Sequence, residues 1–220
     1  MTVTITVTFT VFFVLTLLLG HWRQISWVIG SSKVAASTCL IILAVIFATE
    51  SSSFYSIAIL CGVSLGAFGD VAMLSKRKSA SIVAMALFGI GHLAYLFAFS
   101  QLEINVTQSI ICFGVLLIVF RQIYQWLSND LSSSLRIGVI GYSVVLLLVC
   151  AVALSTRING YPALVGLAAT LFMLSDFFVA SYRFKRPKLS DKVIGLPLYY
   201  TAQLFYIYSI EQNDLNWLMI

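Results

Sequence analysis

Long apolar runs dominate the chain, and short polar stretches separate them. Each run approaches the roughly 20 helical residues that cross the hydrocarbon core of a bilayer. The runs are continuously apolar and lack a period of two, which favours helices over a β-barrel. The pattern predicts an all-α fold, a polytopic membrane helical bundle of eight transmembrane helices that forms one domain over residues 1–220. The predicted spans lie near residues 3–19, 34–49, 55–75, 80–100, 106–127, 135–155, 161–183 and 193–211.

The first run begins with threonines that alternate with apolar residues over positions 2–8. A single alternating segment cannot close a barrel, so we expect the start of a helix whose threonine hydroxyls bond back to the backbone. No basic segment precedes this run and no small-residue cleavage site follows it. We therefore expect a retained first span and not a cleaved signal peptide.

Composition supports the membrane assignment. Apolar residues make up 60% of the chain and charged residues only 10%, whereas a soluble domain carries roughly 25% charged residues. The four cysteines all fall inside apolar runs and lack the spacing of metal ligands. We expect them to be packing residues and not a disulfide framework.

The basic residues are distributed unevenly along the chain. Twelve of the 13 lysines and arginines fall at the odd-numbered connections, and Arg157 alone falls on the other side. Because lysine and arginine accumulate in cytoplasmic loops, this predicts cytoplasmic odd-numbered connections and both termini outside. The same bias explains the net charge of +5 without a nucleic-acid partner.

A weak internal repeat accompanies this pattern. LGAFGDVAML in the third predicted span resembles TLFMLSDFFV in the seventh, and each precedes a basic connection. GHLAYLFAFS in the fourth span and YYTAQLFYIYS in the eighth also look related. The pattern indicates a possible four-plus-four repeat whose halves have the same orientation.

Two of the eight acidic residues, Asp70 and Asp176, fall inside predicted spans. An ionised side chain at this depth costs about 3 kcal/mol or more, so both must face the bundle interior, a partner or water. Asp70 precedes Lys76 by six residues and Asp176 precedes Arg183 by seven. At a rise of 1.5 Å per residue, both are expected about 10 Å from the cytoplasmic end and at one level.

Further polar residues are expected at reachable depth. His92 and Tyr95 lie about one turn apart, and helical spacing also places Tyr199 and Gln203 on one face. The remaining candidates are Lys33 at the mouth of the second span, Tyr142, Ser175 and Tyr200. Together they predict a cavity lined by acid–base groups, in which low dielectric allows a carboxyl group to stay protonated.

Other chemistries fit these residues less well. The chain has only two histidines, too few good ligands for zinc hydrolysis, and we expect no metal and no cofactor. It also lacks a nucleophile elbow and the phosphate-binding glycine motifs. The chemistry that still fits these residues is acid–base hydrolysis by a pair of carboxyl groups, as in glycosidases. The plainer alternative is that the two aspartates only hold helices together.

The motifs LGAFGDVAML, GIGHLAYLFAF, FMLSDFFVA and YYTAQLFYIYS, in this order and spacing, resemble the YhhN-like lysoplasmalogenase family of integral membrane proteins. The family's lysine–proline pair at the second span is Lys33–Val34 here, and LRIGVIGY carries Gly138 where a proline is usual. The resemblance covers most of the chain. It implies eight spans and a location in a bacterial inner membrane.

The resemblance also implies an activity, hydrolysis of the vinyl ether bond of lysoplasmalogens or a related lysophospholipid. The products would be a fatty aldehyde and a glycerophospho head group. In this hypothesis the catalytic residues are Asp70, Asp176 and His92, and the substrate-binding residues are Lys33, Tyr95, Tyr142, Ser175, Tyr199, Tyr200 and Gln203. The expected partners are the lysophospholipid substrate and membrane lipids. Two alternatives stay open, a small proton-coupled transporter or lipid carrier, and a purely structural lipid-binding protein.

Overall fold

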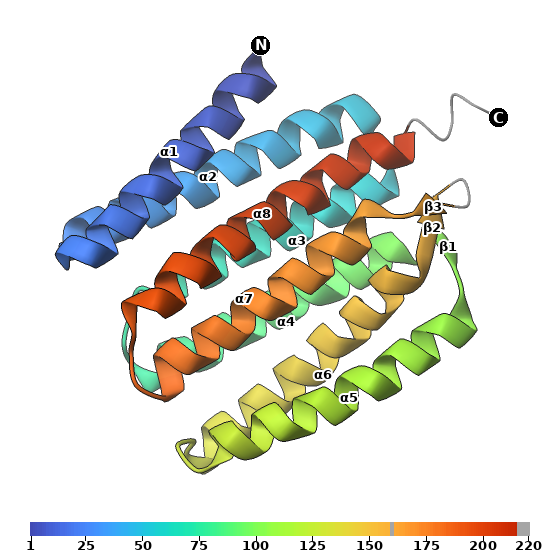
Figure 1. Ribbon diagram of the computed structural model, residues 1–220. Helices are drawn as coiled ribbons and strands as arrows, with labels where there is room; N and C mark the ends of the chain where they lie inside the picture. The colour runs from blue at the N-terminus through green and yellow to red at the C-terminus, as the bar shows by residue number, and fades with distance from the viewer. Residues whose placement is uncertain (159–160, 215–220) are drawn as a thin grey trace.

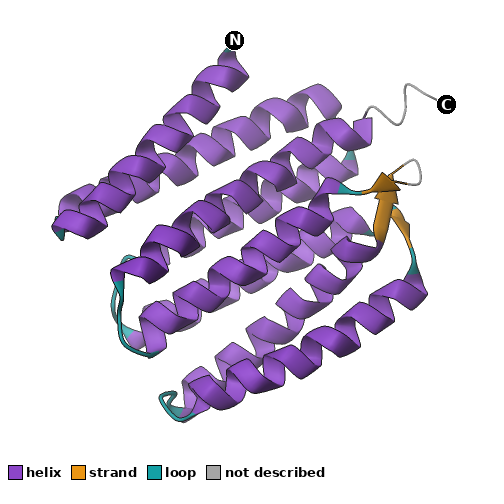
Figure 2. Cartoon of the chain, viewed as in Figure 1, coloured by secondary structure: helices purple, strands orange, loops and turns teal. Residues whose placement is uncertain are grey.

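The computed structural model describes residues 1–158 and 161–214, and helices make up nearly all of it (Figure 2). The helices are α1 (Thr2–Arg23), α2 (Ser26–Ser51), α3 (Phe54–Ala72), α4 (Lys78–Phe99), α5 (Val106–Ser128), α6 (Ser133–Ser155), α7 (Leu164–Phe184) and α8 (Leu189–Asp214). The prediction of an all-α bundle of eight helices is confirmed.

Within the described residues, the seven helices α1 to α7 are long and apolar enough to cross a membrane. The chain is therefore a multi-pass integral membrane protein. Helix α8 has 26 residues but a more polar composition, and it packs beside α7 at the centre of the bundle. The eighth span stays a prediction, and so does the orientation of the termini.

The helices form a central group with a pair on each side (Figure 1). Helices α3, α4, α7 and α8 make up the centre, with α1 and α2 packed on one side and α5 and α6 on the other. Helix α5 is the most peripheral, because Leu127 is its only buried residue. The outer pairs thus cover two sides of the central group.

The alternating threonines of α1 behave as predicted. Thr6 Oγ1 donates to the carbonyl of Thr2 at 2.9 Å, Thr8 to Thr4 at 2.8 Å and Thr10 to Thr6 at 2.9 Å. Each hydroxyl is thus satisfied inside its own helix, and the segment carries no strand character.

Several predicted boundaries are wrong because the helices are longer than their apolar runs. Helix α2 begins at Ser26 and not near residue 34, because only two residues separate it from α1 and Gln24 turns the chain in a left-handed conformation (φ 56°). Helix α8 begins at Leu189, before the span predicted from residue 193, and it contains Pro197.

A small antiparallel sheet joins two connections, which the apolar pattern did not predict. Its strands are β1 (Glu103–Ile104), β2 (Thr156–Ile158) and β3 (Tyr161–Pro162), in the order β1-β2-β3 (Figure 1). Glu103 pairs with Arg157, and Ile158 pairs with Tyr161. We call this the sheet end, and we call the other end, with the connections 24–25, 73–77, 129–132 and 185–188, the basic end.

Candidate active site

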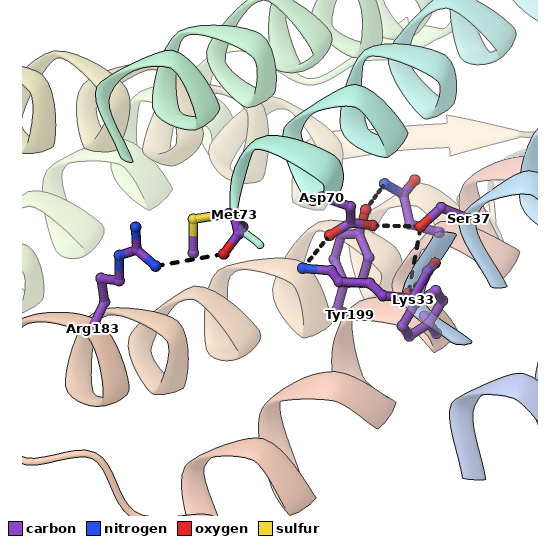
Figure 3. Close-up of polar contacts among 8 residues, drawn as sticks. Lys33, Ser37, Asp70, Met73, Arg183 and Tyr199 are labelled. Carbon is purple, nitrogen blue, oxygen red and sulfur yellow. Dashed lines mark hydrogen bonds and ion pairs between the residues drawn. The ribbon is translucent and has the colours of Figure 1, made fainter. Parts of the chain in front are cut away.

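Asp70 lies on α3 and receives two side chains from α2 (Figure 3). Lys33 Nζ lies 2.9 Å from Asp70 Oδ1, and Ser37 Oγ donates to Asp70 Oδ2 at 2.7 Å. Only 3% of Asp70 is exposed. Both carboxylate oxygens therefore have partners, and the ammonium group of Lys33 stabilises the ionised form of this acid.

The position of Lys33 differs from the prediction. It was expected in the first connection, at the mouth of the second span, but it lies in the eighth position of α2. Lys33 and Ser37 are four residues apart, which places them on one face of α2 and lets both reach the same carboxylate. The lysine is therefore an internal partner of Asp70.

A second network connects α4 and α8. Tyr95 donates its hydroxyl hydrogen to Gln203 Oε1 at 2.6 Å, and Gln203 Nε2 donates to the hydroxyl of Tyr199 at 3.3 Å. The shared face predicted for Tyr199 and Gln203 is thus confirmed. Tyr200 is also buried, and its hydroxyl approaches Ser37 Oγ at 3.4 Å. These contacts join the network to the Asp70 group.

Two glycines of α3 allow this close packing. A Cβ atom on Gly62 would lie 2.2 Å from Cε1 of Tyr95, and one on Gly66 would lie 2.8 Å from Nε2 of Gln203. Neither position has room for a larger residue unless the polar side chains move. These two glycines therefore let α4 and α8 approach α3 closely.

His92 is buried on α4, with 1% of its surface exposed. Its Nδ1 lies 2.7 Å from the carbonyl oxygen of Phe88. Because a carbonyl only accepts, Nδ1 carries the hydrogen, and Nε2 of the neutral ring is an acceptor. Among the described residues Nε2 has no hydrogen-bond partner. Nε2 is therefore a base to which no described group donates a hydrogen bond. The ring of His92 packs against that of Phe172 with a centroid distance of 4.6 Å.

Asp176 lies on α7, half-buried, and accepts a hydrogen bond from the hydroxyl of Tyr142 on α6. In the part of the chain that the structure describes, no lysine, arginine or histidine lies within salt-bridge distance of it. Its principal partner is therefore a neutral phenol, in contrast to the ammonium group at Asp70.

The two carboxyl groups do not form a contacting pair. No hydrogen bond joins Asp70 and Asp176 among the described residues. Arg183 near the end of α7 donates to the carbonyl of Ser75 at 2.6 Å and to that of Met73 at 3.5 Å, which connects the end of α7 to the end of α3 (Figure 3). The equal depth expected for the two acids stays a prediction.

Aromatic side chains connect the two groups. Figure 3 shows Tyr199 beside Asp70. The ring of Tyr199 lies 5.4 Å from that of Phe172, and His92 contacts Phe172 on one side and Tyr142 at 5.7 Å on the other. The predicted residues are thus brought together along one internal path, which we call the polar–aromatic path. It runs from Asp70 through Tyr199, Phe172, His92 and Tyr142 to Asp176. The path also includes the side chains that contact these residues or one another, which are Lys33, Ser37, Tyr95, Tyr200, Gln203 and Tyr206.

One predicted residue lies apart from this path. Ser175 is buried, but its hydroxyl donates to the carbonyl of Phe172 at 2.7 Å, inside its own helix. Its carbonyl faces the position of Gly195 on α8. The sequence neighbour of Asp176 therefore serves helix packing, since adjacent helical residues point in different directions.

Three residues of the path were missed: Ser37, Phe172 and Tyr206. Ser37 lies one turn after Lys33, so helical spacing was an available signal. Tyr206, 0% exposed, stacks on Tyr95 with a centroid distance of 4.2 Å, and its hydroxyl has no partner among the described residues. Only its spacing of three residues from Gln203 marked it in the sequence, and tyrosines at such spacing are usually packing residues.

One pocket of the structure lies away from the cavity that was expected around these residues. A pocket of about 270 Å³ lies near the sheet end between α6 and α7, lined by Ala153, Leu154, Thr156, Ala163, Leu164, Gly166 and Leu167. None of these is a predicted site residue, and the side chains of the path pack against one another. No cluster that could hold a metal ion is found among the described residues.

The fold and the path together define a polytopic helical membrane protein with a buried set of acid–base groups. The model of the YhhN family matches residues 28–210, and the chain belongs to this family. The match includes every residue of the polar–aromatic path. No curated protein and no solved structure matches the chain.

Proposed function

We propose that this protein is a membrane-embedded hydrolase that cleaves the vinyl ether bond of a lysoplasmalogen or a related lysophospholipid. Membership of the YhhN family supports a hydrolase of this kind. The products are a fatty aldehyde and a glycerophospho head group. The reaction needs a neutral acid, a base for water and surroundings that keep bulk water out.

The observation that carries this proposal is the contrast between the partners of the two aspartates. Asp70 has the ammonium group of Lys33 at 2.9 Å, which stabilises its ionised form. Asp176 has a phenol as its partner, and a carboxyl group in surroundings of low polarity without a cation favours its neutral form. In the proposed mechanism Asp176 is the general acid, and Asp70 is the fixed negative charge.

The reaction begins with transfer of a proton from Asp176 to the β-carbon of the vinyl ether. The electron pair of the double bond forms the new C–H bond, and positive charge develops on the α-carbon and its oxygen. The carboxylate left on Asp176 stabilises this oxocarbenium ion. The hydroxyl of Tyr142 supports that carboxylate through its hydrogen bond.

Water then adds to the α-carbon, and His92 is the proposed base. Its Nε2 is an available acceptor because Nδ1 donates to the carbonyl of Phe88. The imidazolium of His92 then donates its proton to the ether oxygen of the hemiacetal, and the hemiacetal hydroxyl gives its proton to the carboxylate of Asp176. The C–O bond breaks, the aldehyde and the alcohol leave, and both residues regain their starting protonation states. Gln203, held by Tyr95 and Tyr199, orients the glycerol hydroxyl groups in this scheme.

The proposal is tested with the purified full chain in detergent and a 1-alkenyl lysophosphatidylethanolamine, with aldehyde release as the measurement. Replacing a general acid removes roughly a hundred- to ten-thousandfold in rate, and we expect that loss for Asp176→Asn. Thermal unfolding of the variant shows whether it is folded. Wild-type turnover in both Asp70→Asn and Asp176→Asn would refute the carboxyl mechanism.

The same preparation distinguishes the alternatives that the sequence left open. Reconstituted into proteoliposomes, a proton-coupled carrier would move lysolipid across the bilayer in a manner dependent on Asp176 and release no aldehyde. A purely structural lipid-binding protein would show neither uptake nor aldehyde, and its aspartate variants would differ from wild type only in stability.

A further inference from the structure

Three helices meet around an aromatic ring at the basic end of the bundle. Lys192 Nζ, from the first turn of α8, lies 4.1 Å from the ring centroid of Tyr182 on α7. The ring of His21, from the last turn of α1, lies 6.4 Å from the same ring and nearly perpendicular to it. An ammonium group over a phenol ring is held in place by a cation–π interaction.

The ammonium group of Lys192 has no carboxylate within salt-bridge distance among the described residues. Two further cations, Lys33 and Arg183, lie near enough to act on it electrostatically. Lys33 is paired with Asp70. The guanidinium group of Arg183 donates to neutral acceptors, including Ser81 Oγ at 2.9 Å. Two of the three cations thus lack an anionic partner.

The nearby carboxylates do not balance this charge. Asp70 and Asp191 are the acidic residues that act on Lys192. Asp191 is buried, and its Oδ2 has no hydrogen-bond partner among the described residues. Among the described residues neither carboxylate forms a salt bridge with Lys192, so its ammonium group has no anionic partner within the protein.

We propose that Lys192 and His21 bind the phosphodiester group of a glycerophospholipid at this end of the bundle. Lysine binds phosphate as a point charge, and the histidine ring offers an N–H donor in either tautomer. Tyr182 is a positioning residue, because it contacts Lys192 and not the ligand. The site lies where a lipid head group would enter, at the end of helices that are otherwise apolar.

The place of this group on α8 agrees with the position of the polar–aromatic path. Tyr199 follows Lys192 by seven residues, which is two turns or about 10 Å along the helix. A lysolipid with its phosphate at Lys192 would therefore direct its glycerol toward Tyr199 and Gln203. In this respect the inference rests on the proposed function, while the anion site itself does not.

The site is tested by binding, with a lipid that cannot react. A 1-O-alkyl lysophosphatidylethanolamine has a saturated ether, and its affinity for the full chain in detergent can be titrated. Because a hydrogen bond to a charged group contributes about 1.5–3 kcal/mol, Lys192→Met should weaken binding by about ten- to a hundredfold. Lys192→Arg, which keeps the charge, should restore most of the affinity and shows that the methionine variant did not fail through its fold.

Lys188→Met is the matched control, because it removes the same charge from an exposed residue of the connection before α8. It should bind like wild type, and 1-O-alkylglycerol, which lacks the phosphate, should bind wild type and Lys192→Met equally. Equal affinity of the phospholipid analogue for wild type and Lys192→Met overturns the proposal.

Two further measurements are needed. The first distinguishes a lipid head group from free phosphate, and the second distinguishes this binding site from the proposed hydrolase. Inorganic phosphate should compete with the alkyl lysolipid only weakly, and tight phosphate binding without lysolipid binding would overturn the head-group assignment. Since the ether analogue is not cleaved, Lys192-dependent binding without aldehyde release from the vinyl ether would support this site and refute the hydrolase.

Discussion

Asp70 and Asp176 are the two acidic side chains inside the apolar part of the bundle, and their surroundings differ. The Asp70 carboxylate is almost fully buried, with a lysine and a serine on its two oxygens. Asp176 is half-buried and has a tyrosine hydroxyl as its partner. The first group ties α2 to α3 through charge, whereas the second ties α6 to α7 through a bond from a neutral donor.

This difference matters because the same residue type occurs in similar sequence contexts, GD in the third helix and SD in the seventh. A buried carboxylate that loses its ammonium partner is strongly destabilising, because its charge is then left uncompensated. A carboxyl group with a neutral donor can change its protonation without leaving a charge unpaired. The comparison therefore separates an aspartate suited to structure from one suited to proton transfer.

The largest effect on stability is expected from Lys33→Met. It leaves the Asp70 carboxylate buried without a cation, and breaking a buried ion pair in this way costs about 3–5 kcal/mol. The measurement is equilibrium unfolding in mixed detergent micelles, compared with wild type.

The double variant Lys33→Met/Asp70→Asn is the control for this prediction. It removes both charges and should recover most of the lost free energy of unfolding. If the single and double variants unfold alike, the ion pair contributes no coupling and the comparison between the two aspartates fails.

A smaller effect is expected from Ser37→Ala, which removes the second donor to Asp70. A hydrogen bond to a charged acceptor contributes about 1.5–3 kcal/mol, and the free energy of unfolding should fall by that amount. Ser31→Ala on the same helix is a suitable control, because Ser31 is exposed and its hydroxyl donates to its own helix. An equal change in the free energy of unfolding for Ser37→Ala and Ser31→Ala would contradict the assignment of Ser37 as a stabilising donor to Asp70.

Tyr142→Phe should cost less stability, about 0.5–1.5 kcal/mol, because it removes one hydrogen bond of a half-buried group. Its effect on turnover should be the larger one, since Asp176 loses the only donor it has among the described residues. Unfolding and aldehyde release measured on one preparation test both statements. If Tyr142→Phe lowers the free energy of unfolding as much as Lys33→Met does, the surroundings of Asp70 and Asp176 do not differ in their contribution to stability.

The smallest effect is expected from Ser175→Ala. The hydroxyl of Ser175 bonds to its own helix, so turnover should stay within about twofold of wild type and stability within about 0.5 kcal/mol. A marked loss of aldehyde release with an unchanged unfolding midpoint would show that Ser175 takes part in substrate binding or catalysis.

Helical periodicity and the cost of charge in lipid account for what was predicted correctly. They gave eight helices, the back-bonded threonines of α1 and the shared face of Tyr199 and Gln203. They also singled out Asp70 and Asp176, because an acidic residue in an apolar run needs a partner. The sheet end was missed, since pairs of two- and three-residue strands have no periodicity to detect.

The sequence by itself determined which residues needed partners, because burial in an apolar medium makes an unpaired polar group costly wherever it lies. Tertiary structure decided which partner each received. Lys33 turned inward to Asp70 because α2 begins early, and Asp176 met Tyr142 because α6 packs against α7. Those contacts join residues 34 to 37 positions apart, and spacing along one helix cannot specify how two helices face each other.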